Sequence, residues 1–343
     1  MEIREITDKK IWDSFVQGLP DFTFLQGWNW GEFHRENKER VWRLGAYKEG
    51  ELVACMLSVS VTARRGSFIF VPHGPLSKTG DISECLKPLL EKLKEIAFSS
   101  RYAFIRISPL ALANTENKTL FKKFGFRSAP SYMHAEETWI LPLVDDENSL
   151  LKNMRKTARN LISRAEREGV VITKSRDVKD LAILLELQDK TAERHNFVPF
   201  SEKYLRTEFE IFKESDQVLL FLGSHKGLIS SAAIIIFYGK RAFYFQSGSV
   251  KSEAPVSYLL QWEVIKEAKR RGCELYNLWG VAPEGDSKHQ WAGLTTFKSS
   301  FGGYRKDYMH AQDLPLSKKY WLSYAIEKLP RTLRVRLRRE KKS

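Results

Sequence analysis

The sequence is poor in cysteine and has no long run of apolar residues. Its three cysteines, Cys55, Cys85 and Cys273, are far apart and form no CxxC pair. This spacing excludes a disulfide framework and a cysteine-based zinc site, and it predicts three small buried side chains. No apolar run approaches the ~18 or more residues of a membrane-spanning helix. The charged segment 1–12 lacks the apolar core of a signal peptide, so we expect a cytoplasmic protein.

Histidine is also scarce, with seven residues in the chain. His73, His195 and His289 show neither the spacing of metal ligands nor a nearby nucleophile and acid with which to form a catalytic group. We therefore expect structural roles for these side chains, and we predict no metal site.

Positive charge, by contrast, is in excess. The chain has 56 lysines and arginines against 42 acidic residues, which gives a net charge of +14. A field of this sign attracts nucleic acid, anionic lipid or phosphorylated metabolites, although many basic proteins bind none of them. The length of 343 residues favours two domains.

Two parts of the chain resemble each other. The residues FKKFG from Phe121 correspond to FKSSFG from Phe297, and YMHA occurs from both Tyr132 and Tyr308. Phe297 lies as far from Phe121 as Tyr308 lies from Tyr132, so both blocks share one register. We interpret this repetition as a duplicated domain.

Each half also shows the same order of expected elements: a strand meander, a helix, a strand, a short helix and a final strand. The short helix that leads into FGF or FGG resembles the last helix-to-strand step of the GNAT acyltransferase fold. We therefore predict an α/β (α+β) protein of two tandem GNAT-like domains, 1–143 and 144–312, with the tail 313–343 packing back on the first. The expected strands are 52–62, 67–71, 102–107, 217–222, 228–237, 241–246 and 274–279, and the expected helices are 84–97, 258–271 and 317–329.

A glycine-rich loop for coenzyme A is missing. Enzymes of the GNAT type that use coenzyme A hold its pyrophosphate with backbone N–H groups of such a loop at a helix N-terminus. The segment 252–257 has no glycine, and its Pro255 lacks an N–H group, while the segment 78–83 has one glycine. We expect no coenzyme A and no other cofactor, and an acyl group that arrives on another carrier.

Several motifs extend across the chain. They are FLQGWNWGEF from Phe24, VPHGPL from Val71, FIRISP from Phe104, MRKTAR from Met154, TAERH from Thr191, and WGVAP from Trp279 followed by WAG from Trp291 and FK from Phe297. Together they resemble the Fem peptidyltransferases, which build the cross-bridges of peptidoglycan. The last group is the most specific, and the resemblance covers essentially the whole chain.

The resemblance implies an aminoacyltransferase that moves an amino acid from aminoacyl-tRNA to a stem-peptide amine of a peptidoglycan precursor. A tRNA donor accounts for both the missing coenzyme A loop and the positive charge. No segment keeps an apolar heptad over several turns, so the chain resembles the compact members without a coiled-coil arm. Peripheral contact with the inner face of the membrane is also implied, because the precursor is lipid-linked in part of the family.

The resemblance places a catalytic lysine at Lys298. The reaction is aminolysis of an ester, and a fixed cation beside the developing oxyanion lowers the barrier. The alternative is that Lys298 is a solvated helix lysine, which is what we expect of Lys122, its counterpart in the first repeat.

The same resemblance implies substrate-binding roles for Trp30, His34, Tyr204, Tyr258 and Phe297. Each also has a plainer interpretation, because tryptophan and tyrosine are often core residues and His34 fits a surface helix equally well.

At two positions the sequence differs from relatives that use a nucleotide-linked precursor, and both differences concern the acceptor. Ser108, which we include among the substrate-binding residues, stands where relatives with a nucleotide-linked precursor have an acidic residue. Phe200 stands where they have an arginine. Both departures favour a lipid-linked precursor.

The segment 150–168 is predicted as one amphipathic helix with an apolar stripe and a cationic face. We predict that Lys152, Arg155, Lys156 and Arg159 contact tRNA phosphates, although charged helix faces are usually only solvated. The basic tail 331–343 is a further candidate for contact with tRNA or an anionic membrane, or a solubilising end.

Two other functions remain open from the sequence. The first is a GNAT-like enzyme that transfers an aminoacyl or acyl group to a protein or another amine. The second is a non-catalytic, basic tRNA-binding module on an acyltransferase fold.

Overall fold

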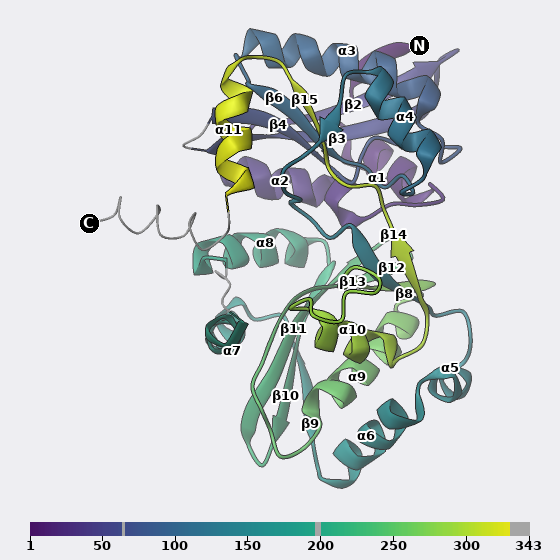
Figure 1. The fold of residues 1–343 in the computed structure, drawn as a ribbon. Coiled ribbons are helices and arrows are strands. Elements are labelled where there is room, and N and C mark those ends of the chain that lie inside the picture. The colour runs from purple at the N-terminus through teal and green to yellow at the C-terminus, as the bar shows by residue number, and fades with distance from the viewer. Residues whose placement is uncertain (64–65, 196–199, 330–343) are drawn as a thin grey trace. The chain divides into compact units, whose positions relative to one another are not determined.

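The computed structural model describes residues 1–63, 66–195 and 200–329. The chain divides into two compact units (Figure 1). Within the described residues, unit 1 contains Met1–Glu136 and 307–329, and unit 2 contains Glu137–Lys306.

Unit 1 is built on an eight-stranded sheet. Its elements are β1 (Glu2–Glu5), α1 (Lys9–Gln17), η1 (Phe24–Gln26), α2 (Trp28–Glu36), β2 (Val41–Lys48), β3 (Glu51–Ala63), β4 (Gly66–Pro72), β5 (Leu76–Ser77), α3 (Ser83–Ser99), β6 (Phe104–Ser108), α4 (Thr115–Lys123), β7 (Arg127–Ser128), β15 (Gln312–Pro315) and α11 (Lys319–Lys328).

Unit 2 is built on a seven-stranded sheet. Its elements are β8 (Glu137–Pro142), α5 (Glu147–Asn153), α6 (Lys156–Arg167), β9 (Val171–Ser175), η2 (Val178–Asp180), α7 (Leu181–His195), α8 (Glu202–Glu214), β10 (Val218–His225), β11 (Leu228–Tyr238), β12 (Arg241–Ser249), α9 (Val256–Arg270), β13 (Leu275–Gly280), α10 (Ala292–Ser299) and β14 (Tyr304–Asp307).

The two sheets have the same topology. The strand order is β1-β2-β3-β4-β6-β15-β7 in unit 1 and β9-β10-β11-β12-β13-β8-β14 in unit 2. The eighth strand of unit 1, the short β5, lies off this path and pairs with β3. Each sheet contains one parallel pair, β4 with β6 and β12 with β13, and a long helix, α3 or α9, connects the two strands of that pair. The predicted pair of GNAT-like domains is confirmed.

The two repeated blocks occupy equivalent places. Phe121 lies on α4, which leads into β7, and Phe297 lies on α10, which leads into β14. Both strands are the last in their sheet order. The turn before β14 requires glycine, because a Cβ on Gly303 would lie 2.1 Å from the Ile140 carbonyl oxygen and its φ is +79°. The interpretation of the repeated blocks as a duplication is confirmed.

One strand of each sheet comes from an unexpected part of the chain. β8 follows β7 in sequence but pairs with β13 of unit 2, and β15 follows β14 but pairs with β6 and β7 of unit 1. The units therefore divide at Glu136 and Lys306, whereas the sequence-based boundaries are at 143 and 312. Strand patterns show where a strand forms but not which sheet it joins, which accounts for the difference.

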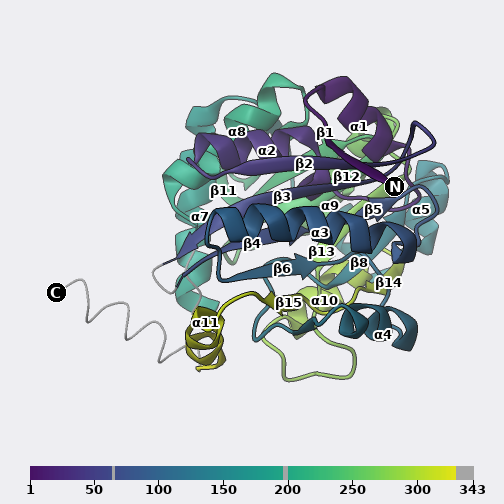
Figure 2. The ribbon, with the colours of Figure 1, turned by 90° about the horizontal axis from the view of Figure 1, so that it is seen from above.

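The core of unit 1 lies between α3 and one face of its sheet. Apolar residues recur along α3 at helical spacing, and Leu86, Leu89 and Leu93 are fully buried against strand residues such as Ile69 and Ile105. Figure 2 shows α3 lying across the strands of this sheet. In unit 2 the corresponding core is formed by α9, α6 and the sheet.

One predicted helix is wrong in its extent. The segment 150–168 forms two helices, α5 and α6, because Met154 adopts an extended conformation. The Arg155 amide donates to the Ser300 carbonyl (2.9 Å) instead of to its own helix. A tertiary hydrogen bond thus interrupts a segment whose periodicity favours one continuous helix.

Other expectations concern burial and length. Cys55, Cys85 and Cys273 are buried free thiols, as predicted. The longest helix of the described residues is α3, with 17 residues. Within those residues, no helix combines the length and apolar character needed to cross a membrane, and no cluster of three or more potential metal ligands occurs.

Candidate active site

The candidate site of unit 2 lies where its two parallel strands separate. β12 and β13 pair only through Arg241–Phe243 and Leu275–Asn277. β12 then continues to Ser249 and β13 to Gly280, and in the described chain no later residue of one strand pairs with the other. On its other side β13 pairs with β8, and this pairing is irregular between Asn277 and Gly280, where β13 has separated from β12.

Lys298 occupies this separation. The residue belongs to α10, is only 4% exposed, and its Nζ donates to the Gly280 carbonyl of β13 at 2.7 Å. The same Nζ lies 5.5 Å from the ring centroid of Tyr244 on β12. One contact on each diverging strand therefore holds the ammonium group between them. The alternative of a solvated helix lysine is wrong.

Burial changes the acidity of this group. Desolvation lowers the pKa of Lys298 to about 7. No carboxylate of the described residues forms an ion pair with it, so nothing offsets the desolvation. A strongly shifted pKa caused by desolvation is typical of groups at functional sites.

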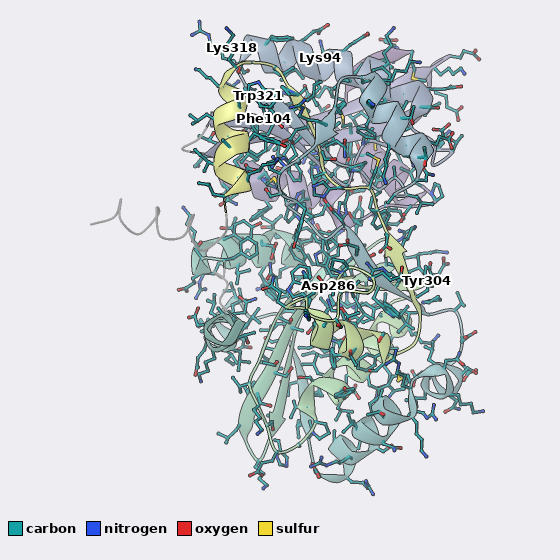
Figure 3. The ribbon with its side chains drawn as sticks, viewed as in Figure 1. Lys94, Phe104, Asp286, Tyr304, Lys318 and Trp321 are labelled. Carbon is teal, nitrogen blue, oxygen red and sulfur yellow. The ribbon has the colours of Figure 1, made fainter. Side chains whose placement is uncertain are left out.

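A strained turn presents the carbonyl that Lys298 binds. Trp279 has a φ of +65°, which is rare for a bulky side chain, and its amide donates to the Asn277 side-chain oxygen at 2.7 Å. A hydrogen bond connects the following loop to α10: the Ala282 amide donates to the Thr295 hydroxyl at 2.8 Å. Figure 3 labels Asp286 in this loop and Tyr304 on β14. Backbone strain of this kind often marks a functional site.

Aromatic side chains line the lysine's helix. Phe297 packs edge-on against Tyr258 of α9, with ring centroids 5.0 Å apart, and against Phe301 at 5.2 Å. Of the residues predicted from the sequence, the structure thus brings Lys298, Phe297 and Tyr258 together. The sequence did not identify Tyr244, Trp279 or Gly280 as site residues. In the sequence, the WGVAP motif includes Trp279 and Gly280, but the motif alone assigns no role to them.

The predicted tRNA-binding cations lie beside the end of the same helix. The bond from Arg155 to Ser300 joins the start of α6 to the residue after α10. Lys152, Arg155 and Lys156 are exposed, whereas the Arg159 guanidinium donates to the carbonyls of Lys152 (2.8 Å) and Met154 (2.6 Å). Three cations are therefore available to an anion, and Arg159 closes the end of α5.

The FemAB family model matches residues 7–125, 131–226 and 223–328. The chain belongs to the FemAB family. It is 21% identical over 422 aligned residues to the lipid II:glycine glycyltransferase of Staphylococcus aureus (strain MRSA252), covering all of this chain and 99% of that protein. Among solved structures it is similar to FemX, with a TM-score of 0.82, 20% identity, and coverage of 95% of this chain and 100% of that one.

A tandem GNAT protein from the clavulanic acid biosynthesis pathway is similar in fold as well. Its TM-score is 0.54 at 11% identity, with coverage of 81% of this chain and 84% of that one. The fold and the family membership agree with each other. The FemAB chain described here is an aminoacyltransferase.

In this FemAB protein, two of the residues predicted to bind substrate in unit 1, Trp30 and His34, belong to an aromatic cluster. Trp30 is 1% exposed and packs against Phe33 and His34, with ring centroids 5.0 Å away in both cases, and against His134 at 5.8 Å. Trp30 is therefore a core residue. The His34 Nδ1 pairs with Glu39, and this contact orients the ring.

Two buried polar atoms of the predicted substrate-binding residues in unit 1 have no hydrogen-bond partner among the described residues. They are the His34 Nε2 and the Ser108 hydroxyl at the end of β6. Buried polar atoms without partners are rare, and one explanation is a ligand or water that satisfies them. Both atoms belong to residues for which the sequence predicted substrate contact, a role that the structure leaves as a prediction.

Tyr204 lies apart from Lys298, in the first turn of α8. Its ring stacks on Phe200, with centroids 4.5 Å apart and planes within 11°. At the position where relatives with a nucleotide-linked precursor have an arginine, this chain therefore has Phe200, whose ring is stacked on that of Tyr204. Pro255, which precedes the first residue of α9, occupies its N-cap position.

Proposed function

We propose that this FemAB protein transfers an amino acid from aminoacyl-tRNA to a stem-peptide amine of a lipid-linked peptidoglycan precursor. The observation that carries the proposal is the buried Lys298, held between two diverging strands of a GNAT-like unit. The curated relatives are named as lipid II:glycine glycyltransferases, which supports the same class of acceptor. A non-catalytic tRNA-binding module would have no need for a desolvated lysine in this place.

The chemistry requires only a positioned cation. The acceptor amine attacks the ester carbonyl, a C–N bond forms, and the carbonyl oxygen becomes an oxyanion. Lys298, as an ammonium group, stabilises that oxyanion. The C–O bond to the ribose then breaks, and the proton released by the amine ends on the departing ribose oxygen. The low pKa of Lys298 rises as the oxyanion forms, because an adjacent negative charge favours the protonated form.

Two observations support a tRNA donor. The exposed cations Lys152, Arg155 and Lys156 adjoin the end of α10, so phosphates bound there would lie near the helix that carries Lys298. Pro255 at the N-cap of α9 removes a backbone donor where a coenzyme A pyrophosphate would bind. We therefore propose that no coenzyme A takes part.

The lipid-linked acceptor follows from the side chains that replace charged ones. The stacked pair Phe200 and Tyr204 offers no cation to a nucleotide pyrophosphate. Ser108 presents a neutral hydroxyl instead of a carboxylate. A protein that acts on such an acceptor would work in the cytoplasm at the inner face of the membrane.

The experiment is mass spectrometry of precursors after incubation with a mixed pool of charged tRNAs. Lipid-linked and nucleotide-linked precursors are offered in parallel, together with a peptide that carries a free amine. We expect a mass increase of one or more amino acids on the lipid-linked precursor. Equal or better turnover of the nucleotide-linked precursor would contradict the preference for a lipid-linked acceptor. Exclusive modification of the peptide would contradict a role in peptidoglycan synthesis.

A further inference from the structure

A basic pocket lies in unit 1, and none of the residues assigned above is among those that line it. Its volume is about 580 Å³, and it is formed by the end of α3, the β3–β4 hairpin and the start of α11. Three cationic side chains and several hydroxyl groups line it. They include Arg40, Arg101, Lys319, Thr62, Ser67 and Ser100. No acidic side chain of the described residues lines it.

The charge exceeds what the fold itself requires. The C-terminal end of α3 carries the negative end of a helix dipole, which is worth about half an elementary charge. Three cations more than offset it. Arg40 is oriented by a 3.1 Å bond from its Nη1 to the Ser100 hydroxyl. The pocket therefore has the donors and the net charge that an anionic group such as phosphate requires.

Two exposed apolar side chains adjoin residues of the same pocket along α3 and α11. Phe98, which precedes the pocket residues at the end of α3, is 60% exposed, and Leu322, one turn after Lys319 on α11, is 61% exposed. Trp321, which Figure 3 labels on α11, lies on a different face of that helix from Lys319, and its ring packs against Arg127 of β7 at 4.5 Å. Aromatic and apolar side chains next to cations are typical of surfaces that enter the interfacial layer of a membrane.

We propose that this pocket binds the phosphate group of an anionic membrane lipid and that the adjoining residues Phe98 and Leu322 contact the acyl boundary. The inference deepens the proposed function and rests on it for the presence of a membrane-bound acceptor. Binding to the bilayer at this edge of unit 1 would keep the enzyme next to that acceptor. A pocket for free phosphate alone would not require the two exposed apolar side chains beside it.

The test is vesicle co-sedimentation of the full chain, with the basic tail kept in every variant. The vesicles contain phosphatidylcholine alone or phosphatidylcholine with about a third phosphatidylglycerol. The double variant Arg101→Asn, Lys319→Ala removes two cations of the pocket. Asparagine is chosen because Arg101 has a φ of +59°, which asparagine tolerates. We expect its affinity for the anionic vesicles to fall about tenfold or more.

The matched control is Lys122→Ala, Lys123→Ala on α4, which removes the same charge from exposed positions. It should change vesicle affinity less than about twofold. The variant Phe98→Ser, Leu322→Ser should lose the part of the binding that resists high salt. If the double variant loses thermal stability, Lys319→Glu alone, at an exposed position, provides the second measurement and should weaken binding in the same way.

Three results would overturn the proposal. The first is an equal loss in the pocket variant and the α4 control, which would mean unspecific attraction. The second is stabilisation of wild type but not of the double variant by inorganic phosphate, with no vesicle binding, which would indicate a soluble ligand. The third is a loss of tRNA binding in the pocket variant alone, with vesicle binding intact. None of these assays involves turnover, so the pocket and the reaction can fail separately.

Discussion

The two units share one topology, but their parallel strands differ in how far they stay paired. In unit 1, β4 and β6 stay paired up to Pro72 and Ser108, the last residues of both strands. In unit 2, β12 and β13 separate after Phe243 and Asn277, although both continue. A duplicated fold can thus keep one copy closed and open the other, and only the open copy has room for a reacting group between its strands.

The lysines of the two repeats make the same point. Lys122 on α4 is exposed, whereas Lys298 on α10 is buried against Gly280 and Tyr244. Burial lowers the pKa of Lys298 to about 7. Identical local sequence, Phe followed by Lys at the end of a short helix, therefore leads to two chemically different side chains.

The largest expected effect is on catalysis. Lys298→Ala should lower kcat by ~10²–10³ with little change in substrate affinity, because the oxyanion loses its stabilising cation. Steady-state kinetics with charged tRNA and the lipid-linked precursor would measure it. Lys298→Arg should rescue only in part, since a planar guanidinium is larger than an ammonium group.

Lys122→Ala is the matched control for this comparison. It removes the corresponding lysine of the first repeat, and kcat should stay within about twofold of wild type. Similar losses from both substitutions would show that the difference in burial has no catalytic meaning.

The pH dependence sharpens the same contrast. If the ammonium form is the active one, the ratio of wild-type to Lys298→Ala activity should fall as pH rises through about 7. The expected slope is about tenfold per pH unit above the pKa. The ratio cancels the titration of the acceptor amine, which affects both proteins. A ratio that rises with pH would instead assign Lys298 the role of a base.

A third prediction concerns the donor. The triple variant Lys152→Ala, Arg155→Ala, Lys156→Ala should weaken tRNA binding by about tenfold at moderate salt and reduce the salt slope by about two to three. Filter binding over a range of salt concentrations would measure both quantities.

A triple alanine variant of the exposed α4 lysines Lys118, Lys122 and Lys123 removes the same charge from unit 1. Its salt slope should stay near that of wild type. If this control matches the unit 2 variant, the field of the whole protein attracts tRNA and the cations beside α10 have no special part.

Local signals in the sequence predict much of the fold. The expected strand 228–237 corresponds to β11 and the expected helix 84–97 to α3, because runs of apolar residues and helical spacing are local signals. The exchange of β8 and β15 is not local, since antiparallel pairing with β13 or β6 depends on which sheet has a free edge. The break at Met154 was missed for the same reason, because its cause is the distant Ser300 carbonyl.

The site was predictable only in part. The resemblance pointed to Lys298, but its burial depends on the separation of β12 from β13, which no short motif encodes. Tyr244 and Gly280 act through position alone, as a ring face and a carbonyl oxygen. Trp30, by contrast, shows that a motif residue can belong to the core, since its ring is buried among other rings.

The smallest predicted effect concerns how the two units bury charge. In unit 1 the buried Arg106 is paired with both Asp313 (2.7 Å) and Glu327 (2.9 Å). In unit 2, Glu208 on α8 is 1% exposed, and neither of its oxygens has a hydrogen-bond partner in the described part of the chain. Desolvation therefore raises the pKa of Glu208 to about 8, and the folded protein keeps this carboxyl group protonated at neutral pH.

This difference predicts a stability that depends on pH. Because the pKa is raised from 4.5 to about 8 in the folded state, the unfolded chain ionises first, and the free energy of unfolding falls as pH rises between those values. Glu208→Gln removes the titration, so its advantage over wild type should grow from pH 5 to pH 8 and reach about 1–3 kcal/mol. Urea denaturation at several pH values would measure it. Glu210→Gln, at an exposed position of the same helix, should show no such trend, and a flat difference for Glu208→Gln would mean that the carboxyl group is solvated or paired in solution.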